Sequence, residues 1–294
     1  MSHIRKPKLI ESRLRNHAAF VASDPRTCAG RWRELREGVE ELHVDLGCGK
    51  GIWTTRVAYA NPTALMVGID IEPMCVSFAA ERAAIGGVES SGQSASADSG
   101  FTPAYNTVFT IGSAADLVDF FAPGEIDVLH LNFPTPFPRK KETLKRVTCI
   151  DRLIEYRELL GERGEVRLKT DHQPLFDYTI EQLVCAGYDI TWQARDLLGD
   201  DAACEGAAPS DLLQSGYEER LVAAGAYVHA AHAVVGNAPG RCNSGERVSL
   251  YEYLPDDLES IGYVPLGMED ALFNMKNRRR SERGRASMIS ERTA

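Results

Sequence analysis

The sequence has few cysteines, and they follow none of the usual metal or disulfide patterns. Its 294 residues contain seven cysteines, an odd number, and no two of them form a CxxC pair. A disulfide framework would require an even, regular set, and a structural zinc site would require paired ligands. The seven histidines show no ligand spacing either. We therefore expect a reduced, cytoplasmic protein without a metal site.

Long apolar runs are also missing. Nowhere do about eighteen apolar residues follow one another, which is the minimum for a helix that spans a membrane. The start of the chain has no apolar stretch of the kind that a signal peptide contains. The sequence thus predicts neither a membrane partner nor export, and nothing in it implies an obligate protein partner.

The chain lacks an overall positive charge as well. Its net charge is −9, so no global field attracts nucleic acid to the whole surface. Basic residues are instead concentrated locally, within residues 5–15, 139–146 and 276–285. Patches of this kind can bind phosphates while the rest of the surface stays acidic.

Apolar segments begin to alternate with helical ones at residue 41. Short apolar runs that predict strands occur at 41–46, 64–71, 106–111, 125–133, 164–171 and 188–197, with helical patterns between most of them. Strands that alternate with helices of this length are typical of βαβ units, which build a parallel sheet covered by helices on both faces. The predicted fold class is therefore α/β.

We divide the chain into three parts. Residues 1–40 form a basic N-terminal arm, residues 41–254 a Rossmann-like domain, and residues 255–294 a basic, flexible extension. Within the domain, the polar stretches 89–100 and 199–211 contain too little apolar surface to order themselves. The cations near the C-terminus are either a solvated tail or an arm that follows RNA phosphates.

A glycine-rich turn directly follows the first expected strand. In "DLGCGKG" the glycines stand at positions 47, 49 and 51, and Asp70 ends the second strand about twenty residues later. The pattern is neither GxGxxG nor a phosphate loop. A glycine turn before a helix and a carboxylate that can accept the ribose hydroxyls are typical of Rossmann-like methyltransferases that bind S-adenosylmethionine. The alternative is an ordinary tight turn with a surface aspartate.

The stretch "HLNFPTPFPRKK" (130–141) begins at the end of the fourth expected strand and continues beyond it. Its three prolines remove backbone freedom, and three cations, Arg139, Lys140 and Lys141, come directly after them. A stiff loop at the end of a strand can hold a ligand still, and the cations suggest an anionic one. We expect Arg139, Lys140, Lys145 and Arg146 to contact phosphates; the alternative is a surface turn with solvated charges.

The segment "NFPTPFPRKKETLKRVT" (132–148) resembles the F-x-D-P-W-P-K-x-R-H-x-K-R-R-L-T signature of bacterial tRNA (guanine-N7)-methyltransferases, which act on a guanine in the tRNA variable loop. Further segments are similar to the family in order, among them "DPRTCAGRW", "LKTDHQPLFDYTI" and "SGYEERLVAAGAYV". The resemblance runs from about residue 5 to residue 235. It implies a seven-stranded Rossmann-like sheet, S-adenosylmethionine as cofactor, and tRNA as partner.

The resemblance also implies roles for individual residues. Six of them would bind the cofactor, namely Asp45, Gly47, Gly49 and Gly51 at its methionine end, Asp70 at its ribose, and Ser113 near its adenine. Five would bind the substrate, namely Arg139, Asp171, Ser215, Tyr217 and Glu218. Of these, Asp171 belongs to the family's Thr-Asp pair, which contacts the target guanine.

One departure from the family pattern bears on catalysis. Thr135 stands where the family has an aspartate that is proposed to be catalytic. Because guanine N7 carries an unprotonated lone pair, its methylation requires no general base, and we expect Thr135 to slow the reaction without ending it. Two alternatives stay open: a non-catalytic paralogue that binds tRNA or cofactor, and a methyltransferase of the same fold that acts on a small molecule.

Overall fold

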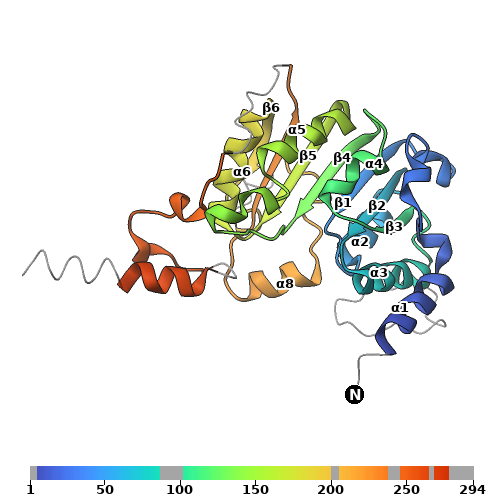
Figure 1. Ribbon diagram of the computed structural model, residues 1–294, viewed down its shortest axis with the longest axis horizontal. Coiled ribbons are helices and arrows are strands. Elements are labelled where there is room, and N and C mark those ends of the chain that lie inside the picture. Colours follow the sequence, from blue (N-terminus) through green and yellow to red (C-terminus); the bar gives the residue numbers. More distant parts are fainter. Residues whose placement is uncertain (1–4, 87–101, 200–204, 238–245, 265–267, 278–294) are drawn as a thin grey trace, which may run out of the picture.

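The computed structural model describes residues 5–86, 102–199, 205–237, 246–264 and 268–277. Seven strands form one sheet in the order β3-β2-β1-β4-β5-β7-β6 (Figure 1). Their bounds are β1 Glu41–Leu46, β2 Ala64–Asp70, β3 Thr107–Ile111, β4 Ile126–Asn132, β5 Leu160–Thr170, β6 Tyr188–Ala194 and β7 His229–Val235. Six of the described strands run in one direction, and β7 runs in the opposite direction between β5 and β6. The predicted seven-stranded Rossmann-like fold is confirmed.

The strand order determines where a ligand can bind. From β1 the chain builds outward to β2 and β3 on one side, and then returns to add β4 and β5 on the other side. At such a reversal point the loops after adjacent strands diverge, which leaves a crevice at the carboxyl ends of the strands. The glycine turn follows β1 and the proline loop follows β4, so both predicted motifs flank this crevice.

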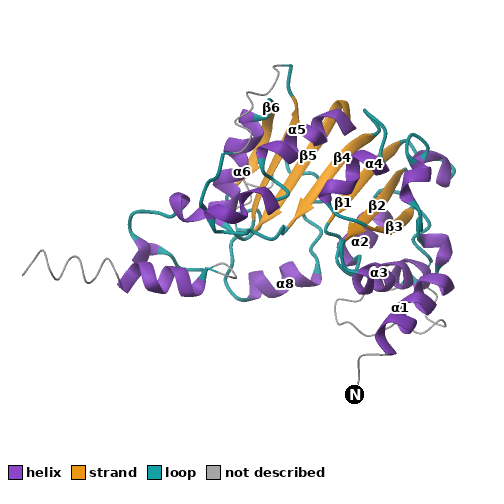
Figure 2. Ribbon diagram, in the orientation of Figure 1, coloured by secondary structure: helices purple, strands orange, loops and turns teal. Residues whose placement is uncertain are grey.

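Different helices cover the two faces of the sheet (Figure 2). Alternate residues of β2 point to opposite faces: Leu65 and Val67 pack in one apolar cluster with α4, α5 and α6, whereas Met66 packs in another with α2 and α3. The helix bounds are α2 Ile52–Ala60, α3 Pro73–Ile85, α4 Leu117–Phe120, α5 Ile150–Leu159 and α6 Gln173–Cys185. Because both faces are buried, β2 is apolar along nearly its whole length.

The described part of the predicted N-terminal arm packs on the domain. Helix α1 (Arg5–Asn16) lies against α3, where Arg13 pairs with Glu81 at 2.9 Å. Further along, the buried Trp32 stacks on Phe121 with a ring-centroid distance of 5.2 Å. Basic residues of this segment thus serve partly in packing, and α1 and residues 268–277 lie at opposite ends of the described structure (Figure 1).

The described part of the predicted C-terminal extension is packed as well. Leu258, Met268 and Leu272 are buried, and Lys276 pairs with Glu259 at 3.3 Å. The basic residues 278–285 lie outside the described residues. None of the described helices has the length and apolar character needed to cross a membrane.

Candidate active site

Three adjoining cavities open at the carboxyl ends of β1, β2, β4 and β5, and Phe133 lines all of them. Cavity A, about 520 Å³, lies between the ends of β1, β2 and the proline loop. Cavity B, about 480 Å³, lies between the glycine turn and helix α8 (Gly216–Ala223). Cavity C, about 450 Å³, lies between the proline loop and the segment after β5. An extended ligand can therefore reach from A to B, with a second ligand in C.

In cavity A the structure brings together four predicted residues, Gly47, Asp70, Ser113 and Thr135. The carboxylate of Asp70 accepts hydrogen bonds from the backbone N–H of Gly49 at 2.8 Å and of Glu72 at 2.9 Å. A carboxylate offers about four acceptor sites, so these two bonds orient Asp70 and leave sites for ligand hydroxyls.

Ser113 lies on the wall of cavity A and begins a short 3₁₀ turn. Its hydroxyl donates to Asp116 at 2.7 Å, and the backbone N–H of Ser113 donates to the same carboxylate at 2.7 Å. These two donors lower the pKa of Asp116. The hydroxyl also accepts from the N–H of Ala115 at 3.3 Å, and the carbonyl oxygen of Ser113 accepts from the N–H of Asp116 at 3.0 Å. Because both of its donors are engaged, Ser113 offers the cavity only its remaining acceptor capacity.

Glycine is required at the three positions of the turn for different structural reasons. All three have positive φ, of 87° at Gly47, 55° at Gly49 and 69° at Gly51. A Cβ on Gly47 or Gly49 would meet nothing within 4 Å, and both residues line cavity B. A Cβ on Gly51 would lie 2.7 Å from Ala79 of α3. Gly51 is buried against that helix and lines none of the three cavities, so it determines the shape of the turn rather than the surface of a cavity.

Asp45 lies beneath the glycine turn in cavity B. It accepts hydrogen bonds from Thr54 at 2.5 Å and from Asn132 at 3.4 Å. Burial raises its pKa to about 6. A cationic ligand group in cavity B would stabilise the charged carboxylate, whereas Lys50 and Arg82 on the same cavity can attract an anionic group.

The proline loop has a strained backbone. Phe133 and Phe137 have positive φ, of 48° and 44°, a region that bulky side chains rarely adopt. The buried Arg146 holds this conformation, because its guanidinium donates to the carbonyl oxygens of Pro136 and Phe137 at 2.9–3.1 Å. It also lies 4.6 Å above the ring of Tyr178.

The prediction that Arg146 contacts phosphates is wrong, because this side chain packs against the proline loop. Arg146 is only 1% exposed and cannot contact RNA phosphates. Arg139, Lys140, Lys141 and Lys145 are exposed, as expected of residues that contact an anionic partner. Strain of this kind persists where the surrounding structure enforces it, often at functional sites. The rigidity of the loop thus depends on a buried cation as well as on the prolines.

Cavity C is lined by four of the predicted catalytic and substrate-binding residues, Thr135, Arg139, Asp171 and Tyr217. Asp171 follows β5 and is mostly buried, with 8% of its surface exposed. Tyr217 comes from α8 and packs edge-on against Phe133, with ring centroids 5.6 Å apart. Thr135 lies where cavities A and C meet, since it lines both.

Comparison with known proteins agrees with this geometry. The model of a protein family described as "Putative methyltransferase" matches residues 39–225. A protein of Streptococcus agalactiae serotype III (strain NEM316), named tRNA (guanine-N(7)-)-methyltransferase, is 32% identical over 198 residues, which are 67% of this chain and 86% of that protein. The chain belongs to this methyltransferase family.

Other similar proteins agree with that assignment. A protein of the same name from Geobacillus kaustophilus (strain HTA426) is 29% identical over 231 residues, which are 79% of this chain and 96% of that protein. Among solved structures, the 16S rRNA methyltransferase KamB superposes with a TM-score of 0.50 at 15% identity, over 70% of this chain and 93% of that one. That likeness concerns the fold alone.

The structure separates the members of the predicted substrate motif on α8. Ser215 caps the helix: its hydroxyl accepts from the N–H of Glu218 at 3.1 Å, and Glu218 accepts from the N–H of Ser215 at 3.4 Å. Glu218 is fully buried and lines none of the three cavities. Tyr217 between them lines cavities B and C. The S-x-x-E spacing of a capping box is a sequence signal for this arrangement.

A buried lysine that the sequence analysis missed is the partner of Glu218. Lys169 of β5 is 1% exposed, and its Nζ lies 2.7 Å from a carboxylate oxygen of Glu218 and 2.7 Å from the carbonyl oxygen of Asp211. Burial lowers the pKa of Lys169 and raises that of Glu218, and the ion pair opposes both shifts. The pair fixes α8 to the sheet.

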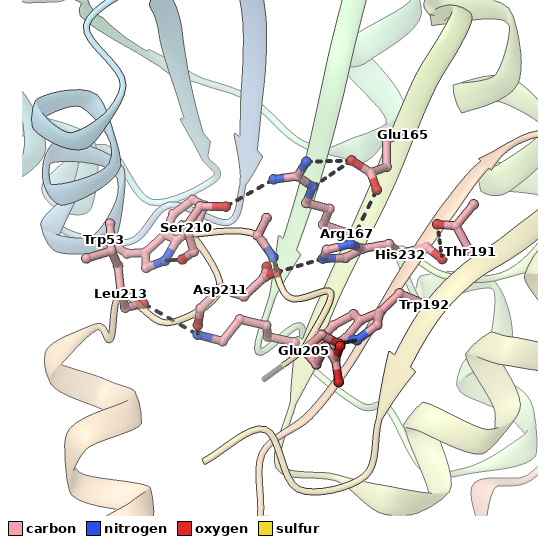
Figure 3. Close-up of polar contacts among 12 residues, drawn as sticks. Trp53, Glu165, Arg167, Thr191, Trp192, Glu205, Ser210, Asp211, Leu213 and His232 are labelled. Carbon is pink, nitrogen blue, oxygen red and sulfur yellow. Dashed lines mark hydrogen bonds and ion pairs between the residues drawn. The ribbon is translucent and has the colours of Figure 1, made fainter. Parts of the chain in front are cut away.

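Segment 205–214 leads into α8 and covers a polar part of the sheet face (Figure 3). Asp211 pairs with His232 at 2.7 Å, and the carbonyl oxygen of Ser210 accepts from the indole of Trp53 at 3.2 Å. Arg167 donates to the hydroxyl of Ser210 at 3.1 Å. The expectation that 199–211 does not order itself is therefore wrong for 205–211, because charged and aromatic partners on the sheet replace apolar burial.

No three His, Cys, Asp or Glu side chains of the described residues come close enough together to hold a metal ion. The five cysteines within the described ranges are free thiols.

Proposed function

We propose that the protein transfers the methyl group of S-adenosylmethionine to N7 of a guanine in the variable loop of tRNA. The observation that carries the proposal is the geometry of cavity C, where Thr135, Arg139, Asp171 and Tyr217 meet beside the cofactor-sized space of cavities A and B. The names of the similar proteins support the same substrate. Because tRNA is the proposed substrate, we infer that the protein works in the cytoplasm.

The residues of cavities A and B fit S-adenosylmethionine. Asp70 presents oriented acceptor sites for the ribose hydroxyls in cavity A. In cavity B, Gly47 and Gly49 leave room for the methionine part, with Lys50 and Arg82 for its carboxylate and Asp45 for its cationic groups. When bound, S-adenosylmethionine supplies an electrophilic methyl group that a nitrogen lone pair can attack.

The protein's own residues then position and stabilise the guanine. Its N7 lone pair lies in the plane of the base, so no residue has to remove a proton before the transfer. Positive charge moves onto the purine during the reaction, and a carboxylate placed to accept from the N1 and N2 donors stabilises that charge. Asp171 is the buried carboxylate of cavity C that can do this. Phe133 and Tyr217 provide apolar walls that exclude water.

The RNA backbone would contact the exposed cations beside cavity C. Arg139, Lys140, Lys141 and Lys145 lie within seven residues of one another, next to the strained loop. Each phosphate neutralised by a cation adds to RNA affinity through the release of counterions. This patch favours RNA over a small molecule as the methyl acceptor.

The proposal is tested by incubating tRNA transcripts with the protein and S-adenosylmethionine and then analysing the nucleosides by mass spectrometry. We expect 7-methylguanosine from the variable loop. Another methylated nucleoside, or methylation of a small molecule but not of tRNA, would contradict the proposal.

Asp70→Ala is expected to weaken cofactor binding about 10- to 150-fold, because the ribose hydroxyls lose hydrogen bonds to a charged acceptor worth roughly 1.5–3 kcal/mol. Calorimetry with S-adenosylhomocysteine measures this change. An analogue without the ribose 2′ and 3′ hydroxyls serves as the matched control, since it should bind the wild type and the variant with similar affinity. Equal affinity of the two proteins for the complete ligand would exclude Asp70 from the site.

Thr135→Asp is expected to raise the single-turnover rate about 10- to 100-fold, or about 1.4–2.7 kcal/mol. The new carboxylate would lie where cavities A and C meet, near the charge that develops on the purine. Thr135→Asn introduces a side chain with the shape of aspartate but without its charge, so this variant should not accelerate the reaction. If the wild type forms no product while Thr135→Asp forms it readily, the natural protein is a binding paralogue and the proposed function fails.

A further inference from the structure

A segment beyond the family match is attached to the proline loop. We call residues 248–263 the C-terminal strap; the family match ends at residue 225. Val248 exchanges two hydrogen bonds with the hydroxyl of Thr143, at 2.9 and 3.1 Å. The N–H of Leu250 donates to the carbonyl oxygen of Pro138 at 3.0 Å. Leu250 itself is fully buried against Leu175 and Tyr178 of α6, so this end of the strap is firmly anchored.

The other end of the strap reaches the proposed guanine site. The hydroxyl of Tyr263 donates to Oδ2 of Asp171 at 2.6 Å. Asp171 forms the wall between cavity C and a smaller cavity of about 280 Å³, which Tyr263 and other strap residues line from the opposite side. Burial and the neighbouring carboxylate raise the pKa of Tyr263, so its hydroxyl remains a donor at neutral pH.

A carboxylate at this position needs such a partner to hold one orientation. The terminal torsion of an aspartate has broad minima, so a carboxylate without restraint rotates easily. One hydrogen bond from a donor behind it fixes that rotation and still leaves other acceptor sites for a ligand. Supporting contacts of this kind hold functional groups in their productive geometry.

We propose that Tyr263 is a positioning residue for methyl transfer, and that the strap supports the substrate site through the hydroxyl of this one residue. Tyr263 holds the Asp171 carboxylate so that its free acceptor sites meet the N1–H and the 2-amino group of the target guanine in cavity C. This inference rests on the proposed function. It predicts that the strap contributes to the recognition of guanine through its 2-amino group, although Tyr263 lines no part of cavity C.

The test compares two tRNAs, one with guanosine and one with inosine at the methylated position, because inosine keeps N7 and N1–H but lacks the 2-amino group. The single-turnover rate constant is measured on both RNAs for the wild type and for Tyr263→Phe, which removes only the hydroxyl. We expect the wild type to prefer guanosine. Tyr263→Phe should lower the guanosine rate about tenfold and the inosine rate much less, so that the preference decreases.

Tyr253→Phe is the matched control. It removes a hydroxyl from the same strap, one that bonds to Glu181 on α6 and lines none of the cavities described here. Its rates and its preference should equal those of the wild type.

Three results would overturn this inference alone. The first is a Tyr263→Phe variant that keeps both the rate and the preference of the wild type. The second is an equal loss on both RNAs, which would show a structural role only. The third is a wild type that methylates both RNAs equally, which would exclude a 2-amino contact while the proposed function stands. If the wild type forms no 7-methylguanosine at all, the proposed function fails and this inference fails with it.

Discussion

Asp171→Asn is expected to lower kcat/KM for tRNA methylation about 10²- to 10³-fold, the usual cost of removing one preorganised group that stabilises transition-state charge. Asparagine has nearly the same shape as aspartate but no charge. Its NH₂ group is a donor and can face the N1 and N2 donors of the guanine, where aspartate would present an acceptor. The effect should appear in the single-turnover rate, because the N1 and N2 protons become more acidic as the purine becomes cationic.

Two controls separate this loss from damage to the fold. Affinity for S-adenosylhomocysteine should not change, since Asp171 lines neither cavity A nor cavity B. Asp177→Asn removes the same charge from α6 at a surface pair with Arg195 and should leave the rate constant unchanged. A rate for Asp171→Asn within threefold of the wild type would remove the carboxylate from the mechanism.

Lys169→Met is expected to lower the free energy of unfolding by about 3–5 kcal/mol, because it leaves the buried carboxylate of Glu218 without a cation. Lys169 and Glu218 are 1% and 0% exposed, so water cannot replace the lost partner. Urea denaturation, with the slope checked for constancy, measures the change.

The double variant Lys169→Met/Glu218→Leu replaces the pair with apolar side chains and should recover most of the lost stability. Arg31→Met breaks an exposed pair with Glu34 and should cost less than about 1 kcal/mol. A loss below 1 kcal/mol for Lys169→Met, or a double variant as unstable as the single one, would show that the pair does not hold α8 in place.

The positions in the fold that were predicted correctly are determined by neighbouring residues. The glycine turn and Asp70 each follow directly from the end of a strand, so local pattern suffices to place them at one edge of a parallel sheet. The proline loop is likewise predicted by neighbouring residues alone. Cavity C could be assembled only through the family resemblance, because Thr135, Asp171 and Tyr217 come from three separate segments.

The parts that were missed depend on tertiary contacts that the local sequence pattern does not show. The basic run around Arg146 predicts a surface cation, yet Arg146 is buried beneath the loop that precedes it. Segment 205–214 is too polar to predict as ordered, and its partners lie on strands far away in the sequence. Tyr263 is 92 residues from Asp171. No periodicity or spacing in the sequence predicts such pairs.

The central claim is that the methyl group goes to N7 of a guanine in tRNA, and replacing that one atom tests it most directly. Two tRNAs are compared, one with guanosine and one with 7-deazaguanosine at the methylated position, where a carbon replaces N7 and offers no lone pair. With methyl-labelled S-adenosylmethionine under single-turnover conditions, we predict label in the guanosine tRNA and none in its 7-deaza counterpart. Equal labelling of both RNAs would contradict the account.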